Sequence, residues 1–147
     1  MTATMKCGLT ASLLMVIVLW CGHVRAEAPQ LTLQVRTGQF SGPVADGTLL
    51  AQGTVTSGDA HNGFWVWSDA NLNGAPLRYT LSGEGRHDNR INVRLTGRDW
   101  RPDVTQGRGM VLMSSDYSAS FSVEVDGNQM LPADTWSLQL HAVALLP

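Results

Sequence analysis

The sequence predicts an all-β fold, an immunoglobulin-like sandwich that lacks its last strand. Every strongly patterned segment after residue 26 alternates apolar and polar residues with period two. Clusters of Gly, Asn, Asp and Pro separate these segments and supply the turns that hairpins require. Short strands at this spacing are typical of a sandwich or a small barrel. A long apolar strand directly precedes the C-terminus, and this indicates that the sheet lacks a strand.

The first 26 residues have the pattern of a signal peptide. Lys6 precedes an apolar run over residues 13–20, and Val24-Arg-Ala26 offers permissive residues for signal peptidase. The apolar run is shorter than the about 20 residues that a membrane span needs. We therefore expect residues 1–26 to be removed on export and residues 27–147 to form one exported domain. Both cysteines lie in the part that is removed, so the mature domain has no disulfide.

Eight segments of the mature chain are predicted to be strands. They cover residues 31–36, 48–57, 63–67, 77–81, 91–95, 110–113, 119–125 and 135–147. Gly53 interrupts the second segment, where we expect a bulge. In the third segment Trp65 and Trp67 share one face, with Phe64 and Val66 opposite. A pair of tryptophans could form a sugar-stacking platform, but aromatic burial favours placing them in the core.

The last predicted strand indicates that part of the sheet is missing. Trp136, Leu138, Leu140 and Ala142 fall on one face, and polar residues fall on the other. A strand this apolar belongs inside a sheet with a neighbour on each side. Either an upstream strand flanks it on both edges, or another polypeptide supplies the missing strand.

We predict a groove between this strand and residues 31–36 that accepts a strand from another chain. Its lining is predicted to be Leu31, Leu33, Val35, Trp136, Leu138, Leu140 and Ala142. A donated strand would provide backbone hydrogen bonds and fill pockets with alternate side chains. Only Glu27-Ala-Pro-Gln30 precede the first strand, whereas a donor needs about 10 residues at about 3.3 Å each. The chain is therefore expected to accept a strand and to donate none, as an end piece of a linear assembly does.

The sequence contains no recognisable catalytic or metal-binding arrangement. His61, His87 and His141 lie on different predicted elements without the spacing of metal ligands. No Gly-x-Ser-x-Gly motif occurs. The formal net charge of −2 disfavours nucleic acid as a partner. We therefore expect neither an enzyme nor a cofactor.

An arginine-rich hairpin region is the candidate for a surface contact. Arg90 and Arg94 share strand parity, and Arg98, Trp100 and Arg101 follow in a loop that contains proline. Trp100 is expected to be exposed there. The arginines could simply form a solvated face of the hairpin. Alternatively, they could form a patch that contacts anions or glycans. A secreted carbohydrate-binding sandwich is therefore the alternative function.

Several segments resemble one family. They are His61-Asn-Gly-Phe-Trp-Val-Trp67, Gly85-Arg-His-Asp88 leading into Ile91-Asn-Val-Arg94, Trp100-Arg-Pro102, and Phe121-Ser-Val-Glu-Val-Asp-Gly-Asn-Gln129. These segments occur in the same order as in AfaD/DraD-type invasins, and the chain resembles those invasins from about residue 31 to 147. The invasins are the minor tip subunits of Afa/Dr adhesins and are related to the AggB-like subunits. Pro132-Ala-Asp-Thr-Trp136 is similar to a turn of chaperone–usher pilins.

The resemblance implies an assembly pathway and a role. It implies folding on a periplasmic pilus chaperone, secretion through an outer-membrane usher, and completion by a strand of the major fimbrial subunit. It also implies a place at the fimbrial tip on the cell surface and a role in attachment to or entry into host cells, with integrins as proposed receptors. The family pattern pairs two cysteines at the places of Ser57 and Ala144. The loss of both cysteines is expected to leave the fold intact and to affect its stability and the strand ends.

Overall fold

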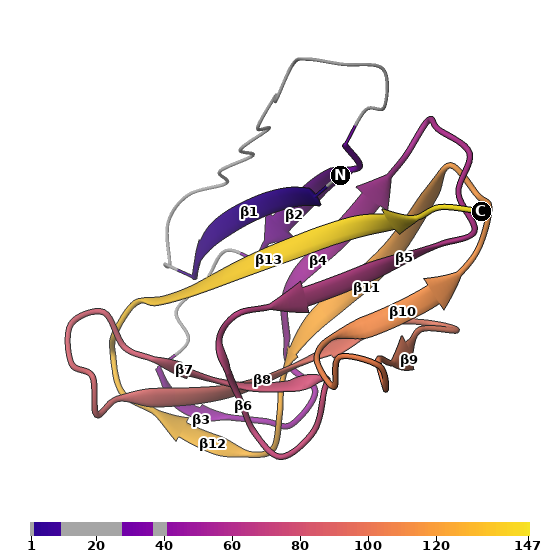
Figure 1. Ribbon diagram of the computed structural model, residues 1–147. Helices are drawn as coiled ribbons and strands as arrows, with labels where there is room; N and C mark the ends of the chain where they lie inside the picture. Colours follow the sequence, from indigo (N-terminus) through magenta and orange to yellow (C-terminus); the bar gives the residue numbers. More distant parts are fainter. Residues whose placement is uncertain (1, 10–27, 37–40) are drawn as a thin grey trace.

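The computed structural model describes residues 2–9, 28–36 and 41–147, and within these ranges the chain is built from β-strands and turns without a helix. None of the described elements is therefore a helix that could cross a membrane. Two curved sheets pack face to face, and a short ribbon closes one end (Figure 1). All the described strand pairs are antiparallel.

The first sheet has five strands and contains both the beginning and the end of the chain. Its order is β1 (Thr2–Leu9), β13 (Trp136–Leu145), β5 (Gly63–Ser68), β10 (Met110–Met113) and β9 (Arg101–Pro102). The second sheet has the order β2 (Gln30–Val35), β4 (Leu49–Thr56), β11 (Ser118–Val125), β8 (Arg90–Thr96), β7 (Arg78–Ser82) and β6 (Asn71–Leu72). β3 (Gly42–Val44) and β12 (Gln129–Leu131) form the short ribbon.

All eight predicted strands are present, with ends that differ by at most two residues. β3, β6, β9 and β12 were not predicted, because two or three residues are too few to show a period. β1 was not predicted either. It lies within the segment whose sequence has the pattern of a signal peptide.

The core lies between the two sheets and follows the predicted alternation. In β13 the side chains of Trp136, Leu138, Leu140 and Ala142 are at most 2% exposed, while the residues between them reach the surface. β8 and β11 show the same alternation. Burial of one face of each strand is the main source of stability in such a sandwich.

Gly53 lies in a regular part of the ladder, so the predicted bulge at this residue is wrong. It is paired with Leu33 on one side and with Phe121 on the other. The register shift between β4 and β11 falls at Leu50 instead. Gly53 is required because the ring of Phe121 lies over it, and a Cβ atom would be 2.1 Å from the ring.

The turn before β13 is held by the carboxylate of Asp134. It accepts hydrogen bonds from the backbone N–H groups of Gly85 at 2.9 Å and Arg86 at 3.1 Å, and from the side-chain amide of Asn89 at 2.9 Å. The N–H of Thr135 also donates to it at 2.7 Å. These bonds stabilise the charged carboxylate, the bond from Gly85 most, and lower its pKa to about 2. Asp134 therefore fixes the start of the last strand to the loop between β7 and β8.

We expect the Asp134→Asn variant to be less stable than the wild type at neutral pH and to respond less to acid. The folded pKa lies below the ordinary value of 3.8, so the stabilisation is present above about pH 4 and is lost as the pH falls toward 2. Urea unfolding midpoints at pH 7, 4, 3 and 2 measure this. Parallel pH profiles of the two proteins would contradict the assignment.

Candidate functional site

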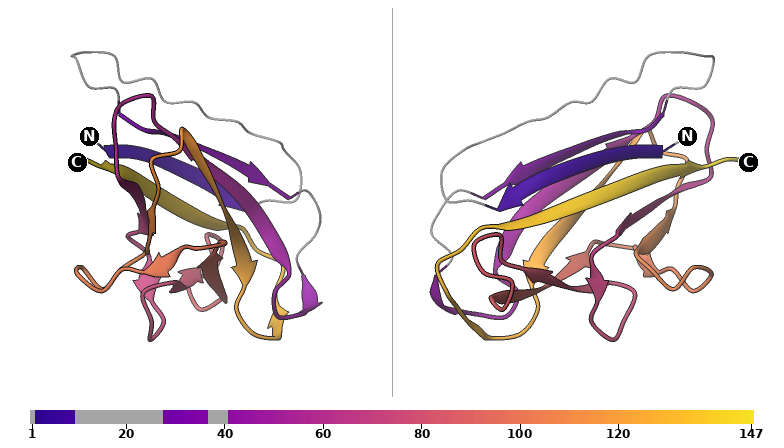
Figure 2. Two further views of the ribbon diagram at one scale, coloured as in Figure 1. Left: turned by 90° about the vertical axis from the view of Figure 1, so that its right-hand side faces the viewer. Right: turned by 60° about the vertical axis from the view of Figure 1, so that its left-hand side comes forward.

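The free edge predicted for the last strand is covered in this structure by β1. β1 and β13 run antiparallel, with pairs from Thr2↔Val143 to Leu9↔Trp136. β5 pairs with the other edge of β13. β1 is the edge strand of the first sheet, and it lies between β13 and β2, the edge strand of the second sheet (Figure 2). Of the two arrangements that the sequence left open, an upstream strand on the second edge is the one seen in this chain.

The seven predicted groove residues lie together where β1 crosses the sandwich. Leu31 and Leu33 of β2 are 6% and 2% exposed, Val35 is partly buried, and the four residues of β13 are buried. Ala3 of β1 is paired with Ala142 and packs against this core. We call the space between β2 and β13 that β1 occupies the strand groove. Its floor is apolar, so an occupant needs an apolar residue at every second position.

The predicted arginine patch divides into two parts. Arg90 and Arg94 lie on the outer face of β8, as their parity predicted. Arg94 is engaged by carboxylates, with Asp46 at 2.6 Å, Asp126 at 3.2 Å and Glu124 at 3.3 Å. Burial would lower its pKa, but the hydrogen bonds to Asp46 and Asp126 outweigh this effect and raise the pKa. Arg94 is therefore a structural residue that closes one end of the sandwich and not a free cation.

Trp100 is buried, so the prediction that it is an exposed contact is wrong. It is 8% exposed, its indole N–H donates to the carbonyl of Ser120 at 2.9 Å, and its ring meets Phe121 edge-on at 6.1 Å. Gly97 leaves room for the ring. A tryptophan flanked by Arg98 and Arg101 looks exposed in sequence, but the turn at Asp99, with a positive φ of 66°, points it inward.

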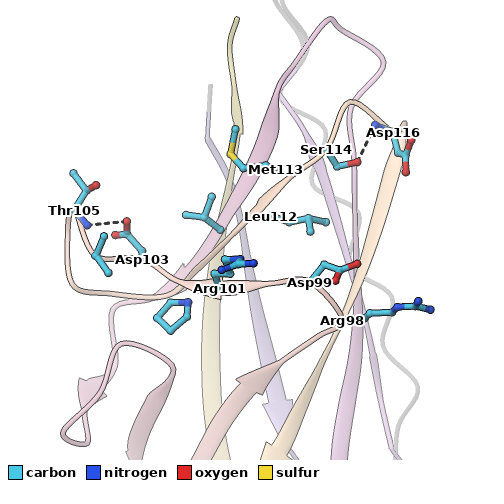
Figure 3. Close-up of a pocket in the computed structure, with 12 residues that line it drawn as sticks. Arg98, Asp99, Arg101, Asp103, Thr105, Leu112, Met113, Ser114 and Asp116 are labelled. Carbon is cyan, nitrogen blue, oxygen red and sulfur yellow. Dashed lines mark hydrogen bonds between the residues drawn. The ribbon is translucent and has the colours of Figure 1, made fainter.

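Arg98 and Arg101 remain exposed and line a surface hollow of about 770 Å³ beside β9 and β10. Figure 3 shows Arg101 in the middle of the hollow, with Leu112 above it. Two large apolar side chains of this wall are open to solvent, Val104 at 90% and Met113 at 68% exposure. Asp99, Asp103 and Asp116 also line the hollow. The hollow therefore combines charged groups of both signs with apolar groups, as protein-binding surfaces often do.

The loop beside the hollow is held in shape by Asp103. Its carboxylate accepts hydrogen bonds from the backbone N–H groups of Thr105 at 3.2 Å and Gln106 at 2.9 Å, and the residue is 7% exposed. Arg101 and Pro102 pair with Val111 and Met110 across the β9–β10 ribbon. The hollow lies at the opposite edge of the first sheet from the strand groove.

Comparison with known proteins places the chain in a family. Residues 40–142 match the family model described as Enterobacteria AfaD invasin protein. Protein AfaD of Escherichia coli is 30% identical over 125 residues, which cover 83% of each chain. The chain belongs to the AfaD invasin family. Protein AggB of Escherichia coli, a second relative, is 27% identical over 70% of this chain and 71% of AggB.

Solved structures of fimbrial subunits have the same fold as this AfaD-family chain. The Salmonella SafD adhesin is 49% identical, with a TM-score of 0.79, over 82% of this chain and 86% of SafD. HdaB, the minor tip subunit of the E. coli Hda pilus, is 24% identical with a TM-score of 0.75, over 82% and 85% of the two chains. The chain is thus an immunoglobulin-like fimbrial subunit of the adhesin and invasin class. These relatives are structural and adhesive subunits rather than enzymes.

Ser57 and Ala144 stand where the AfaD-type resemblance implies two paired cysteines. Ser57 follows β4 directly and is 6% exposed, and Ala144 lies near the end of β13. The chain after Ser57 returns to β13, where the N–H of Asn62 donates to the carbonyl of Leu145 at 2.7 Å. This backbone bond joins the two regions in the AfaD-family chain described here.

The two tryptophans of β5 lie on the outer face of the sheet, so the prediction that they lie in the core is wrong. Phe64 and Val66 are fully buried, whereas Trp65 and Trp67 are only partly buried on the outer face. The two indole rings stack on each other with centroids 3.8 Å apart, and Trp67 also lies nearly parallel to the ring of His141 at 5.2 Å. Because the rings cover one another, the faces that a sugar would stack on are largely taken.

Proposed function

We propose that this protein is a fimbrial tip subunit whose strand groove accepts a strand from another protein. The observation that carries the proposal is the position of β1, which pairs along β13 and covers the apolar floor between β13 and β2. β1 belongs to the segment that the sequence predicts to be removed on export. Removal would uncover the groove, and the major fimbrial subunit is the proposed donor of the strand that replaces β1.

The same groove explains the need for assembly factors. An uncovered edge of β13 would expose backbone donors and acceptors beside Leu138 and Leu140, a template for aggregation. A periplasmic chaperone that covers the groove would prevent this, and an outer-membrane usher would exchange the chaperone for the donor strand. The resemblance to chaperone–usher subunits supports both partners.

We place the contact with the host cell at the hollow beside β9 and β10. Arg98 and Arg101 supply charge there, and Val104 and Met113 supply exposed apolar surface. Arginine and methionine are enriched at protein interfaces. The receptor we propose is a host protein, with integrins and fibronectin as the first two to test. Fibronectin binding is named for the AAF fimbriae of a structural relative that is 22% identical.

Beads coated with the strand-completed protein are expected to attach to cultured epithelial cells through this hollow. The double variant Arg98→Glu and Arg101→Glu should reduce the number of attached beads about tenfold or more, because arginines at the centre of interfaces contribute strongly. Bead counts by microscopy measure the effect, with integrin-blocking antibody and soluble fibronectin as competitors.

The double variant Arg86→Glu and Arg90→Glu provides the matched control for this experiment. Arg86 and Arg90 are exposed arginines that lie outside the hollow, so the same two charge reversals there should leave attachment unchanged. Equal losses from both variants would indicate a general charge effect and would reject the hollow as the contact. Attachment of the folded wild type no higher than that of uncoated beads would reject the adhesive function.

A further inference from the structure

His141 lies on the outer face of β13, next to the strand that occupies the strand groove. His141 of β13 is paired in register with Thr4 of β1 and with Trp67 of β5. Its side chain is only 13% exposed. One ring nitrogen, Nε2, lies 2.6 Å from the carboxylate of Asp69, and the other, Nδ1, lies 2.9 Å from the hydroxyl of Thr4.

The hydrogen bonds fix which atom of the ring donates. A carboxylate only accepts hydrogen bonds, so Nε2 of His141 carries a hydrogen that it donates to Asp69. In the neutral imidazole Nδ1 is then an acceptor, and the hydroxyl of Thr4 donates to it. In the doubly protonated ring Nδ1 would donate instead, and the same hydroxyl oxygen would accept. A hydroxyl is therefore a suitable partner in both states.

The ring cannot easily turn away to seek another partner. Trp67 lies against it at a centroid distance of 5.2 Å and an angle of 19°, and Trp67 is itself stacked on Trp65. Trp65 is anchored in turn by its indole N–H, which donates to the carbonyl of Arg108 at 2.9 Å. An apolar residue opposite His141 would leave Nδ1 of the ring without a hydrogen-bond partner from the strand. Because the side chain is largely buried, the loss of this hydrogen bond is unfavourable.

We propose that His141, positioned by Asp69 and Trp67, selects donor strands that carry a threonine or serine at the position paired with it. This inference rests on the proposed function of the groove as a strand acceptor and adds a specificity rule to it. The apolar floor fixes which face of the donor turns inward. His141 contacts the outward face of the donor at one position. The apolar inward face and the hydroxyl opposite His141 together define the register of the donated strand.

A competition between two peptides tests this rule. The mature protein, residues 27–147, is refolded with an equimolar mixture of a peptide that has the sequence of Thr2–Leu9 and its Thr4→Val form. Mass spectrometry of the purified complex gives the ratio captured. One hydrogen bond of ordinary strength predicts a preference for the threonine peptide of about threefold to tenfold. Valine and threonine both favour strands, so propensity does not account for such a preference.

The Thr2→Val peptide is the matched control. Thr2 has the same strand parity as Thr4 but is paired with Val143, so this substitution should not change capture. The His141→Phe protein, which keeps a ring beside Trp67, should lose the preference for threonine. Equal capture of the unchanged peptide and its Thr4→Val form by the wild type would overturn the rule while leaving the strand-accepting function intact. Capture of neither peptide would overturn the strand-accepting function, and the rule with it.

Discussion

A copy of Thr2–Leu9 joined to the C-terminus of the mature domain is expected to raise its melting temperature by more than about 20 °C. Without a strand in the groove, the side chains of Leu31, Leu33, Val35, Leu138 and Leu140 would face water. Exposing five such side chains costs on the order of 8–15 kcal/mol, at about 1.5–3 kcal/mol each. This is comparable to the whole stability of an ordinary domain.

The geometry of the structure makes the C-terminus the right place for the added strand. β1 runs antiparallel to β13, and its first residues are paired near the end of β13, at Val143. A short flexible linker after Pro147 therefore allows the copy to fold back in the same register. Circular dichroism during heating of the extended and unextended mature proteins measures the difference.

The control is a copy with aspartate at the two positions paired with Leu140 and Trp136. Charged side chains there would be forced into the apolar floor, so this extension should give no stabilisation. If the unextended protein were as stable as the extended one, the groove would not need an occupant. The strand-accepting function would then be rejected.

Replacement of Gly53 by alanine is expected to lower the free energy of unfolding by about 1–3 kcal/mol, and valine by more. The added Cβ would meet three atoms of the Phe121 ring at 2.1–2.5 Å. The ring cannot withdraw freely, because Phe121 is 2% exposed and is packed edge-on against Trp100. Urea unfolding of the strand-completed protein measures the loss.

Gly58→Ala is the matched control for this substitution. Gly58 is exposed, and a Cβ atom there would be 3.9 Å from its nearest neighbour, so the change should stay within about 0.5 kcal/mol. Combining Gly53→Ala with Phe121→Leu should cost less than the sum of the two single changes, since the smaller side chain leaves room. Strict additivity would show that the ring over Gly53 is not the cause.

The sequence was sufficient for the strands and for the inward face of most of them, because period-two alternation needs no knowledge of neighbours. The parity of Trp136, Leu138 and Leu140 is confirmed by their burial. Alternation alone cannot decide which face is inward when both faces are apolar. This is why the prediction failed for β5, where Phe64 and Val66 face the core and the larger tryptophans stack outside.

The candidate site was less predictable because it depends on contacts between distant residues. The role of His141 requires Asp69 and Trp67 from β5 and the turn after it, which no spacing in the sequence brings together. Trp100 was misplaced because the positive φ of Asp99, which turns it inward, is uncommon outside glycine, and most aspartates do not adopt it. Arg94 looked like a free cation because its partners Asp46 and Asp126 are far away along the chain.

The antiparallel pairing of β1 with β13 has a mechanical consequence. The pairing extends over eight residues, and the strand in the groove lies along β13. If that strand belongs to a fibre, tension that acts along the strand direction pulls the two strands past each other along their length. All the hydrogen bonds between them then share the load at once, and none can be opened singly from an end as in a zipper. A subunit joined in this way can hold against flow although no covalent bond links it to the fibre.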